Sequence, residues 1–135
     1  MGRRRQPPPV TLTPLELELM EVLWQQGEAS VQQVQERLQP RRPLAYTTIQ
    51  TVLNVLTRKG RARRRREGRA FVYRPAVSRD SAVRRAVDDL LNRLFDGSAQ
   101  RLVLNLVEER RLTPEELEEL RRLVEEQSNA SREEP

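Results

Sequence analysis

The 135-residue chain contains neither cysteine nor histidine. The usual ligands of soft metal ions are therefore missing, as are the thiol and imidazole groups on which most hydrolases depend. Disulfide bonds are impossible, so nothing in the sequence suits the chain to an oxidising compartment. We expect no enzymatic activity, no cofactor and no metal site.

Long apolar runs are also missing, because no segment approaches the roughly 20 apolar residues of a membrane span. Residues 1–9 are basic and proline-rich with no apolar segment behind them, which is unlike a secretory signal. The sequence thus predicts a cytoplasmic chain without membrane association. Only 36% of its residues are hydrophobic, and pairing with a second copy would enlarge the small core that they can build.

Charge is distributed unevenly along the chain. Residues 1–75 contain 15 Lys or Arg and 6 Asp or Glu, a net charge of +9, whereas residues 76–135 contain 10 and 14, a net charge of −4. A basic segment followed by an acidic one indicates one surface for a polyanion and another for a different partner. An arginine-rich genome would give a similar composition, so the positions of the arginines must decide.

Three short helices are predicted before residue 60, after a disordered basic arm at residues 1–11. The first begins at Thr13-Pro14, where a threonine cap precedes a proline, and ends at Gly27. Ser30 caps the second helix. The third covers residues 45–59, where apolar residues recur with the period of an α-helix.

Residues 61–75 break this period and predict a β-hairpin, with strands at 62–66 and 69–74 around a turn at Glu67-Gly68. Three more helices follow, and residues 127–135 are predicted to be a disordered tail. The predicted fold class is mostly α with a small β-hairpin wing. It combines a winged helix-turn-helix at residues 12–75 with a three-helix dimerisation region at residues 76–126.

The third predicted helix presents polar side chains that suit contacts with DNA. Gln50 can form two hydrogen bonds with adenine, and a threonine can contact the thymine methyl group or a phosphate. Basic residues at both ends of the helix suit phosphates. The candidate DNA-binding residues in this helix and the loop before it are Arg41, Arg42, Tyr46, Thr47, Thr48, Gln50, Thr51, Asn54, Arg58 and Lys59.

The predicted hairpin is strongly basic, because its seven arginines are opposed by a single acid, Glu67. Cross-strand neighbours lie close together, so some of these arginines must repel one another. A run of charge is usually a solvated face, but a wing along the DNA backbone or minor groove would relieve this repulsion. The candidate DNA-binding residues here are Arg63, Arg64, Arg65, Arg66 and Arg69.

The predicted helix at residues 98–109 is apolar almost all round and should be buried from several sides. A second copy of the chain would cover it most simply, since homodimers are the commonest oligomers. The alternative is packing against the winged domain of the same chain. The candidate dimerisation residues are Val87, Leu90, Leu91, Leu94, Leu102, Val103, Leu106, Val107, Leu117 and Leu120.

The chain also resembles the family of penicillinase and methicillin-resistance repressors of the BlaI/MecI type. The resemblance covers residues 12–124 and is carried by four segments: LTPLELELMEVLW, AYTTIQTVLNVLTRKG, GRAFVYRP and RLVLNLVEERRLTPEELEELRRL. It implies a winged-helix transcriptional repressor that dimerises through its C-terminal helices. Such a repressor binds a pseudo-palindromic operator in double-stranded DNA and blocks transcription.

The same resemblance implies that a sensor-linked protease relieves repression by cleaving an Asn–Phe type bond. The matching bond in this chain is Asn105–Leu106, where leucine replaces phenylalanine. Two other functions stay open. A nonspecific architectural DNA-binding protein would use the same arginines without a reading helix, and a protein-interaction module would bind an acidic partner through the basic half.

Overall fold

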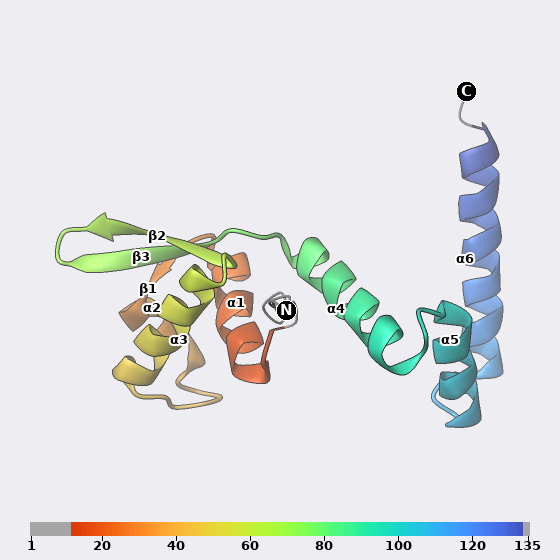
Figure 1. The fold of residues 1–135 in the computed structure, drawn as a ribbon, viewed down its shortest axis with the longest axis horizontal. Coiled ribbons are helices and arrows are strands. Elements are labelled where there is room, and N and C mark those ends of the chain that lie inside the picture. The colour runs from red at the N-terminus through yellow and green to blue at the C-terminus, as the bar shows by residue number, and fades with distance from the viewer. Residues whose placement is uncertain (1–11, 134–135) are drawn as a thin grey trace, which may run out of the picture. The chain divides into compact units, whose positions relative to one another are not determined.

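The computed structural model describes residues 12–133, so the predicted arm at residues 1–11 lies outside it. The fold is mostly α with a small antiparallel sheet, which confirms the predicted fold class. In chain order, the elements of the described segment are α1 (Pro14–Gln26), β1 (Ala29–Ser30), α2 (Val31–Leu38), α3 (Tyr46–Arg58), β2 (Ala62–Glu67), β3 (Ala70–Pro75), α4 (Arg79–Leu94), α5 (Ala99–Glu108) and α6 (Pro114–Glu133) (Figure 1).

Capping boxes begin the helices where the sequence indicates them. Thr13 Oγ1 accepts a hydrogen bond from the Glu16 backbone nitrogen at 3.2 Å, and the Thr13 nitrogen donates to the Glu16 carboxylate at 2.8 Å. Ser30 and Gln33 form the same pair of bonds at the start of α2. These bonds satisfy backbone N–H groups that a helix leaves unpaired at its N-terminus.

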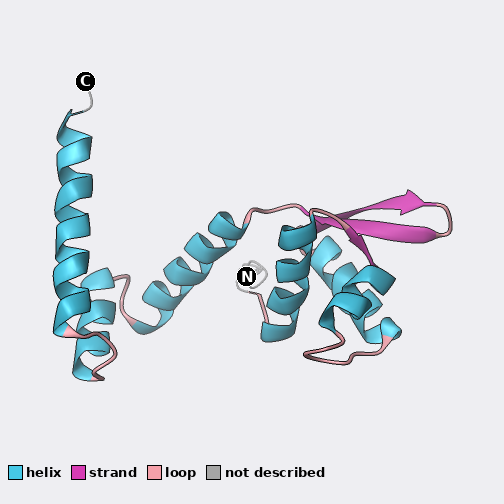
Figure 2. Cartoon of the chain, turned by 180° about the vertical axis from the view of Figure 1, so that it is seen from behind, coloured by secondary structure: helices cyan, strands magenta, loops and turns pink. Residues whose placement is uncertain are grey.

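The sheet has the strand order β1-β3-β2, so β3 lies in its centre (Figure 2). The short strand β1 was not predicted, because two residues are too few to show a strand period. Ala29 pairs with Tyr73 and Ser30 with Val72, and Ser30 also caps α2. The hairpin turn lies at Gly68 and Arg69, one residue later than predicted, with φ = 62° at Gly68.

The hydrophobic core lies between α1, α2, α3 and the sheet. Tyr73 of β3 is its largest fully buried side chain. The buried apolar residues are Leu19, Met20, Val22, Leu23, Ala29, Val31, Val34, Leu38, Ile49, Leu53, Leu56, Ala62 and Tyr73. This core fixes α3 and the β2–β3 hairpin, here called the wing, on one scaffold.

The contacts divide the chain into a first unit that ends at Asp89 and a second that begins at Leu90, rather than near Pro75 as the sequence indicated. The start of α4 belongs to the first unit because it is bonded to α1. Trp24 Nε1 donates to the Val77 carbonyl at 2.9 Å, and Arg79 forms an ion pair with Glu21 at 3.2 Å. Local sequence patterns cannot reveal contacts between segments more than 50 residues apart.

The helices after the wing have no buried residue in the described part of the chain. Leu94 is 72% exposed, Leu104 54% and Val124 67%. The single chain therefore does not bury the helix predicted at residues 98–109 from several sides, and the predicted cover by a second copy stays a prediction. No helix among residues 12–133 is both long and apolar enough to cross a membrane.

Helix α6 continues to Glu133, so most of the predicted disordered tail at residues 127–135 is helical. This segment contains no glycine, and its single proline is the last residue of the chain. Nothing therefore interrupts the backbone hydrogen bonds that extend an existing helix at little cost.

Candidate nucleic-acid interface

The packing of α3 decides which of its side chains face solvent. Ile49, Leu53 and Leu56 are fully buried against the core, so the opposite face of the helix is free. Tyr46 is 44% exposed, and Asn54 is half-buried beside the wing. The remaining polar candidates on this helix are all exposed: Thr47, Thr48, Gln50, Thr51 and Arg58.

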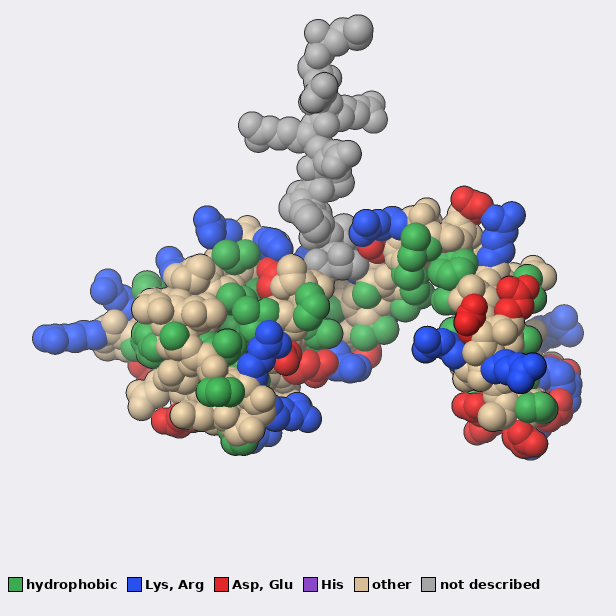
Figure 3. All heavy atoms as spheres, turned by 90° about the horizontal axis from the view of Figure 1, so that it is seen from below, with side chains coloured by type: hydrophobic (Ala, Val, Ile, Leu, Met, Phe, Trp, Pro, Cys, Tyr) green, Lys and Arg blue, Asp and Glu red, His purple; other side chains and the backbone are tan. Residues whose placement is uncertain are grey.

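The wing brings exposed arginines next to α3. Arg63, Arg66 and Arg69 form no ion pair within residues 12–133, although Arg66 lies 5.8 Å from the Phe71 ring centroid. Arg63 lies directly opposite Arg74 in the β2–β3 register, and like charges in this position destabilise a sheet. Figure 3 shows Lys and Arg side chains projecting from the hairpin end of the first unit.

Arg65 differs from the other arginines of the wing because two carboxylates already compensate its charge. Its guanidinium lies 2.8 Å from Glu28 and 3.1 Å from Glu67. The hydrogen bond and ion pair with Glu28 raise the pKa of Arg65, and Glu67 adds to this effect. Of the five candidates in the wing, Arg65 is therefore the one whose positive charge should attract a polyanion least.

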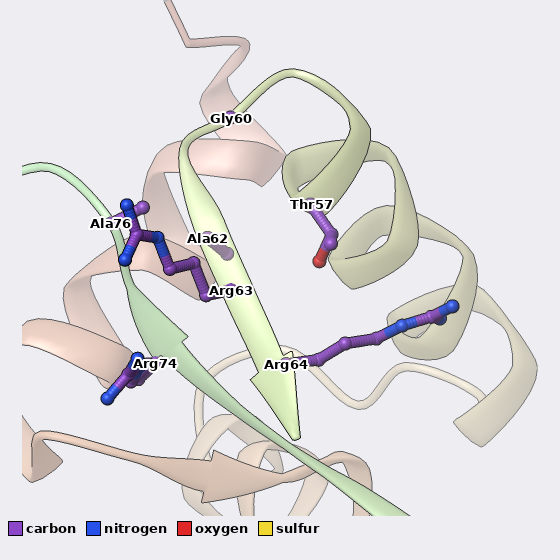
Figure 4. A pocket seen from close by; sticks show the side chains of 7 residues that line it. All are labelled: Thr57, Gly60, Ala62, Arg63, Arg64, Arg74 and Ala76. Carbon is purple, nitrogen blue, oxygen red and sulfur yellow. The ribbon is translucent and has the colours of Figure 1, made fainter. Parts of the chain in front are cut away.

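Arg64 is held along α3 by two contacts. Its Nη1 donates to Asn54 Oδ1 at 2.8 Å, and its guanidinium lies 4.3 Å from the Phe71 ring centroid. Figure 4 shows Arg63 and Arg64 leaving β2 on opposite sides, with Arg64 reaching across α3. Both arginines border an open pocket of about 510 Å³, which Thr57 and Arg74 also line.

Lys59, a candidate phosphate ligand, instead forms an ion pair within the fold. Its Nζ lies 2.8 Å from Glu16 Oε2, and Glu16 is only 4% exposed. Burial raises the pKa of Glu16, but the hydrogen bonds from Lys59 and Thr13 outweigh it and hold this pKa below its ordinary value. Arg42 likewise pairs with Glu18 at 2.8 Å, at a more exposed position.

Replacing Lys59 by methionine is expected to lower the free energy of unfolding by roughly 1–3 kcal/mol, because it leaves the Glu16 carboxylate buried without its cation. Glu16 stabilises the fold above its ordinary pKa of 4.5, and this contribution is lost as the pH falls through the lower folded-state value. The free energy of unfolding should therefore fall less steeply with decreasing pH in the variant than in the wild-type protein. Urea unfolding at several pH values measures both effects, and unchanged stability at pH 7 would contradict this role of Lys59.

The candidate dimerisation residues lie on α4, α5 and α6, where the apolar side chains remain partly or largely exposed. Val87, Leu90, Val103, Val107 and Leu120 are between 38% and 45% exposed. Leu91, Leu102, Leu106 and Leu117 are half-buried, whereas Asn105 is exposed on α5. The single chain therefore leaves an apolar surface uncovered on these helices.

Sequence comparisons identify relatives over most of the chain. The sequence model of the family described as penicillinase repressor matches residues 12–126. The penicillinase repressor of Bacillus licheniformis is 34% identical over 118 residues, which cover 87% of this chain and 92% of that protein. The transcriptional regulator BlaI of Mycobacterium tuberculosis is 39% identical over 112 residues, covering 82% of this chain and 80% of that protein.

Among solved structures, the chain is similar to the monomeric form of Bacillus licheniformis BlaI in complex with the blaP half-operator. That comparison has a TM-score of 0.46 and 32% identity, and it covers 56% of this chain and 89% of the other. The family match extends from the residue before the Thr13 cap into α6, and so includes both units described above. The chain therefore belongs to the penicillinase repressor family.

Proposed function

We propose that this chain is a cytoplasmic transcriptional repressor that binds a pseudo-palindromic operator in double-stranded DNA as a homodimer. In this proposal α3 enters the major groove, and the wing lies along the phosphates beside it. Two such units related by a two-fold axis read the two halves of the operator. The bound dimer prevents transcription by occupying the DNA.

The observation that carries the proposal is the position of the wing beside the exposed face of α3. Hydrogen-bonding side chains on α3 suit base edges, and the arginines of the wing suit phosphates. The set proposed to contact bases is Tyr46, Thr47, Thr48, Gln50, Thr51 and Asn54. The set proposed to contact phosphates is Arg41, Arg58, Arg63, Arg64, Arg66 and Arg69, with a smaller part for Arg42, Lys59 and Arg65 because their charges are paired.

The exposed apolar surface of α4–α6 supports the homodimer. Solvent-exposed apolar patches on a folded chain mark interaction surfaces, and a second copy offers the same patch in return. The proposed dimer contacts are the ten candidates named above. A dimer also doubles the number of phosphate contacts and so strengthens the salt-dependent part of the affinity for DNA.

Selection of DNA fragments from a random pool by the full-length protein tests the proposal. A two-fold symmetric motif with half-sites about one helical turn apart is expected. Enrichment without a motif would instead establish an architectural DNA-binding protein. Failure to bind any DNA at physiological salt would leave a protein-interaction module.

Replacing Gln50 by alanine is expected to lower affinity for the selected operator by about 100-fold, because one bidentate base contact worth about 10-fold is lost in each of the two half-sites. Affinity for random DNA should be unchanged, because phosphate contacts carry it. Gln26→Ala, at an exposed position at the end of α1, is the matched control. Equal losses on operator and random DNA for Gln50→Ala would exclude base reading by this residue.

A sensor-linked protease that relieves repression is a further proposed partner, with Asn105–Leu106 as the bond to be cut. Asn105 is exposed, but its carbonyl accepts a hydrogen bond from the Glu109 nitrogen at 3.0 Å within the last turns of α5. Proteases bind extended chains, so this turn must first unwind. Mass spectrometry of the fragments that accumulate when repression is relieved in cells identifies the bond.

A further inference from the structure

The side chains of Arg64 and Tyr73, from two strands of the wing, meet at the Asn54 amide on α3. Asn54 Oδ1 accepts a hydrogen bond from the Tyr73 hydroxyl at 2.7 Å and another from Arg64 Nη1 at 2.8 Å. Arg64 is in turn stacked over the ring of Phe71, with 4.3 Å between its guanidinium carbon and the ring centroid. Asn54 lies on α3, Arg64 on β2 and Tyr73 on β3, so this cluster ties the wing to the helix.

The two bonds fix the orientation of the Asn54 amide. A carbonyl oxygen has two lone pairs, and both are used by donors from the wing. A rotation of the amide by 180° would place its NH₂ group against Arg64, which can only donate, so the Arg64 bond would be lost, and the Tyr73 hydroxyl would have to turn from donor to acceptor. Asn54 Nδ2 forms no hydrogen bond within the described part of the chain, and it is not buried, because no buried side-chain nitrogen or oxygen among the described residues lacks a partner.

We propose that Tyr73 is a positioning residue for DNA recognition: its buried hydroxyl, together with Arg64, orients the Asn54 amide so that Nδ2 donates to an acceptor on the DNA. This inference rests on the proposed function, because it assigns a role within the same interface. The acceptor is an oxygen or nitrogen of a base edge or a phosphate oxygen. Tyr73 itself is 0% exposed and touches no ligand.

The physical reason is the cost of ordering a side chain on binding. A free asparagine amide samples both orientations and several rotamers, and binding must then select one of them. Here the fold has already made that selection, because the Tyr73 ring is held in the core and its hydroxyl has one partner. A substitution in the core can therefore alter DNA recognition without altering any residue that touches DNA.

The first test replaces Tyr73 by phenylalanine, which keeps the buried ring and removes the hydroxyl. Affinity for the selected operator is expected to fall by about 3- to 10-fold, in line with the loss of one oriented hydrogen bond. The measurement is repeated in an Asn54→Ala background. Because Tyr73 acts through Asn54, the hydroxyl should then have no further effect, so the two losses should not add.

Tyr46→Phe is the matched control, since it also removes one phenolic hydroxyl but lies on the exposed part of α3. The loss of operator affinity caused by Tyr46→Phe should be the same in the wild-type and the Asn54→Ala background. Thermal unfolding of each variant separates stability from binding. If Tyr73→Phe is poorly folded, Arg64→Gln tests the other half of the cluster. Because Arg64 is also a proposed phosphate contact, only the part of its loss that disappears in the Asn54→Ala background reports on the orientation of Asn54.

The pattern of losses identifies the acceptor. A loss confined to one base pair of each half-site indicates a base edge, and an equal loss on every sequence indicates a phosphate. Full operator affinity for Tyr73→Phe, or a loss that adds to that of Asn54→Ala, would overturn the inference while leaving the repressor intact. Failure of the wild-type protein to select any motif would overturn the proposed function itself.

Discussion

Replacing Arg63, Arg66 and Arg69 together by glutamine is expected to lower affinity for DNA of any sequence by about 10³-fold at physiological salt. These three side chains are exposed and have no carboxylate partner within residues 12–133. A dimer would lose six phosphate contacts, so the slope of log affinity against log salt should become shallower by about 5. Stability should not fall, because Arg63 faces Arg74 across the hairpin and its charge is unfavourable in the free protein.

Arg65→Gln is the matched control for this experiment. Arg65 lies on β2, as Arg63 and Arg66 do, and its replacement removes one positive charge, but Glu28 and Glu67 compensate that charge in the free protein. Its effect on the salt slope should be well below that of any one of the three other arginines. Fluorescence anisotropy titrations with operator and random DNA at four salt concentrations provide the slopes. Equal slopes for wild type and the triple variant would exclude the wing from the interface.

Replacing Leu120 by arginine is expected to convert the protein to monomers at micromolar concentration. Leu120 is 45% exposed on α6, and the proposed interface would bury it against the second copy. Each dimer would then contain two unpaired charges at its apolar contact, which raises the dissociation constant by about 10³-fold. The two operator halves would be bound independently, so operator affinity should fall by about 10²-fold while half-site affinity is kept.

Asn129→Arg adds the same charge to α6 nine residues later, on the opposite side of the helix. This control should remain dimeric. Sedimentation equilibrium measures the mass of each protein, and circular dichroism checks that the helices are retained. A Leu120→Arg variant that stays dimeric, or a wild-type chain that is a monomer, would show that α6 does not form the interface.

The fold could be predicted largely from local signals. The predicted caps Thr13 and Ser30 begin α1 and α2, and glycines end α1 and precede the wing. These signals act within four residues, so they remain readable without tertiary structure. The strand β1 and the place of the start of α4 in the first unit were missed, because both depend on contacts between distant segments.

The residues of the candidate interface could be predicted from their types and positions, but which of them are paired with carboxylates within the fold could not. Alternation along β2 predicts two faces, but it cannot show that Arg65 meets Glu28 while Arg63 meets no acid. Glu16 caps α1 through one carboxylate oxygen, and its second oxygen holds Lys59 in the folded chain. The spacing of these two residues along the chain gives no sign of that contact.

The sequence by itself determined the order of the six helices and the two hairpin strands, the family and the basic character of the first unit, because periodicity, capping and charge are local properties. Only the tertiary structure decided which arginines are compensated and which remain open to a polyanion. It also joined Asn54, Arg64 and Tyr73 from three elements into one cluster. Such contacts depend on how the core orients α3 against the wing, and many sequences with the same pattern would orient them differently.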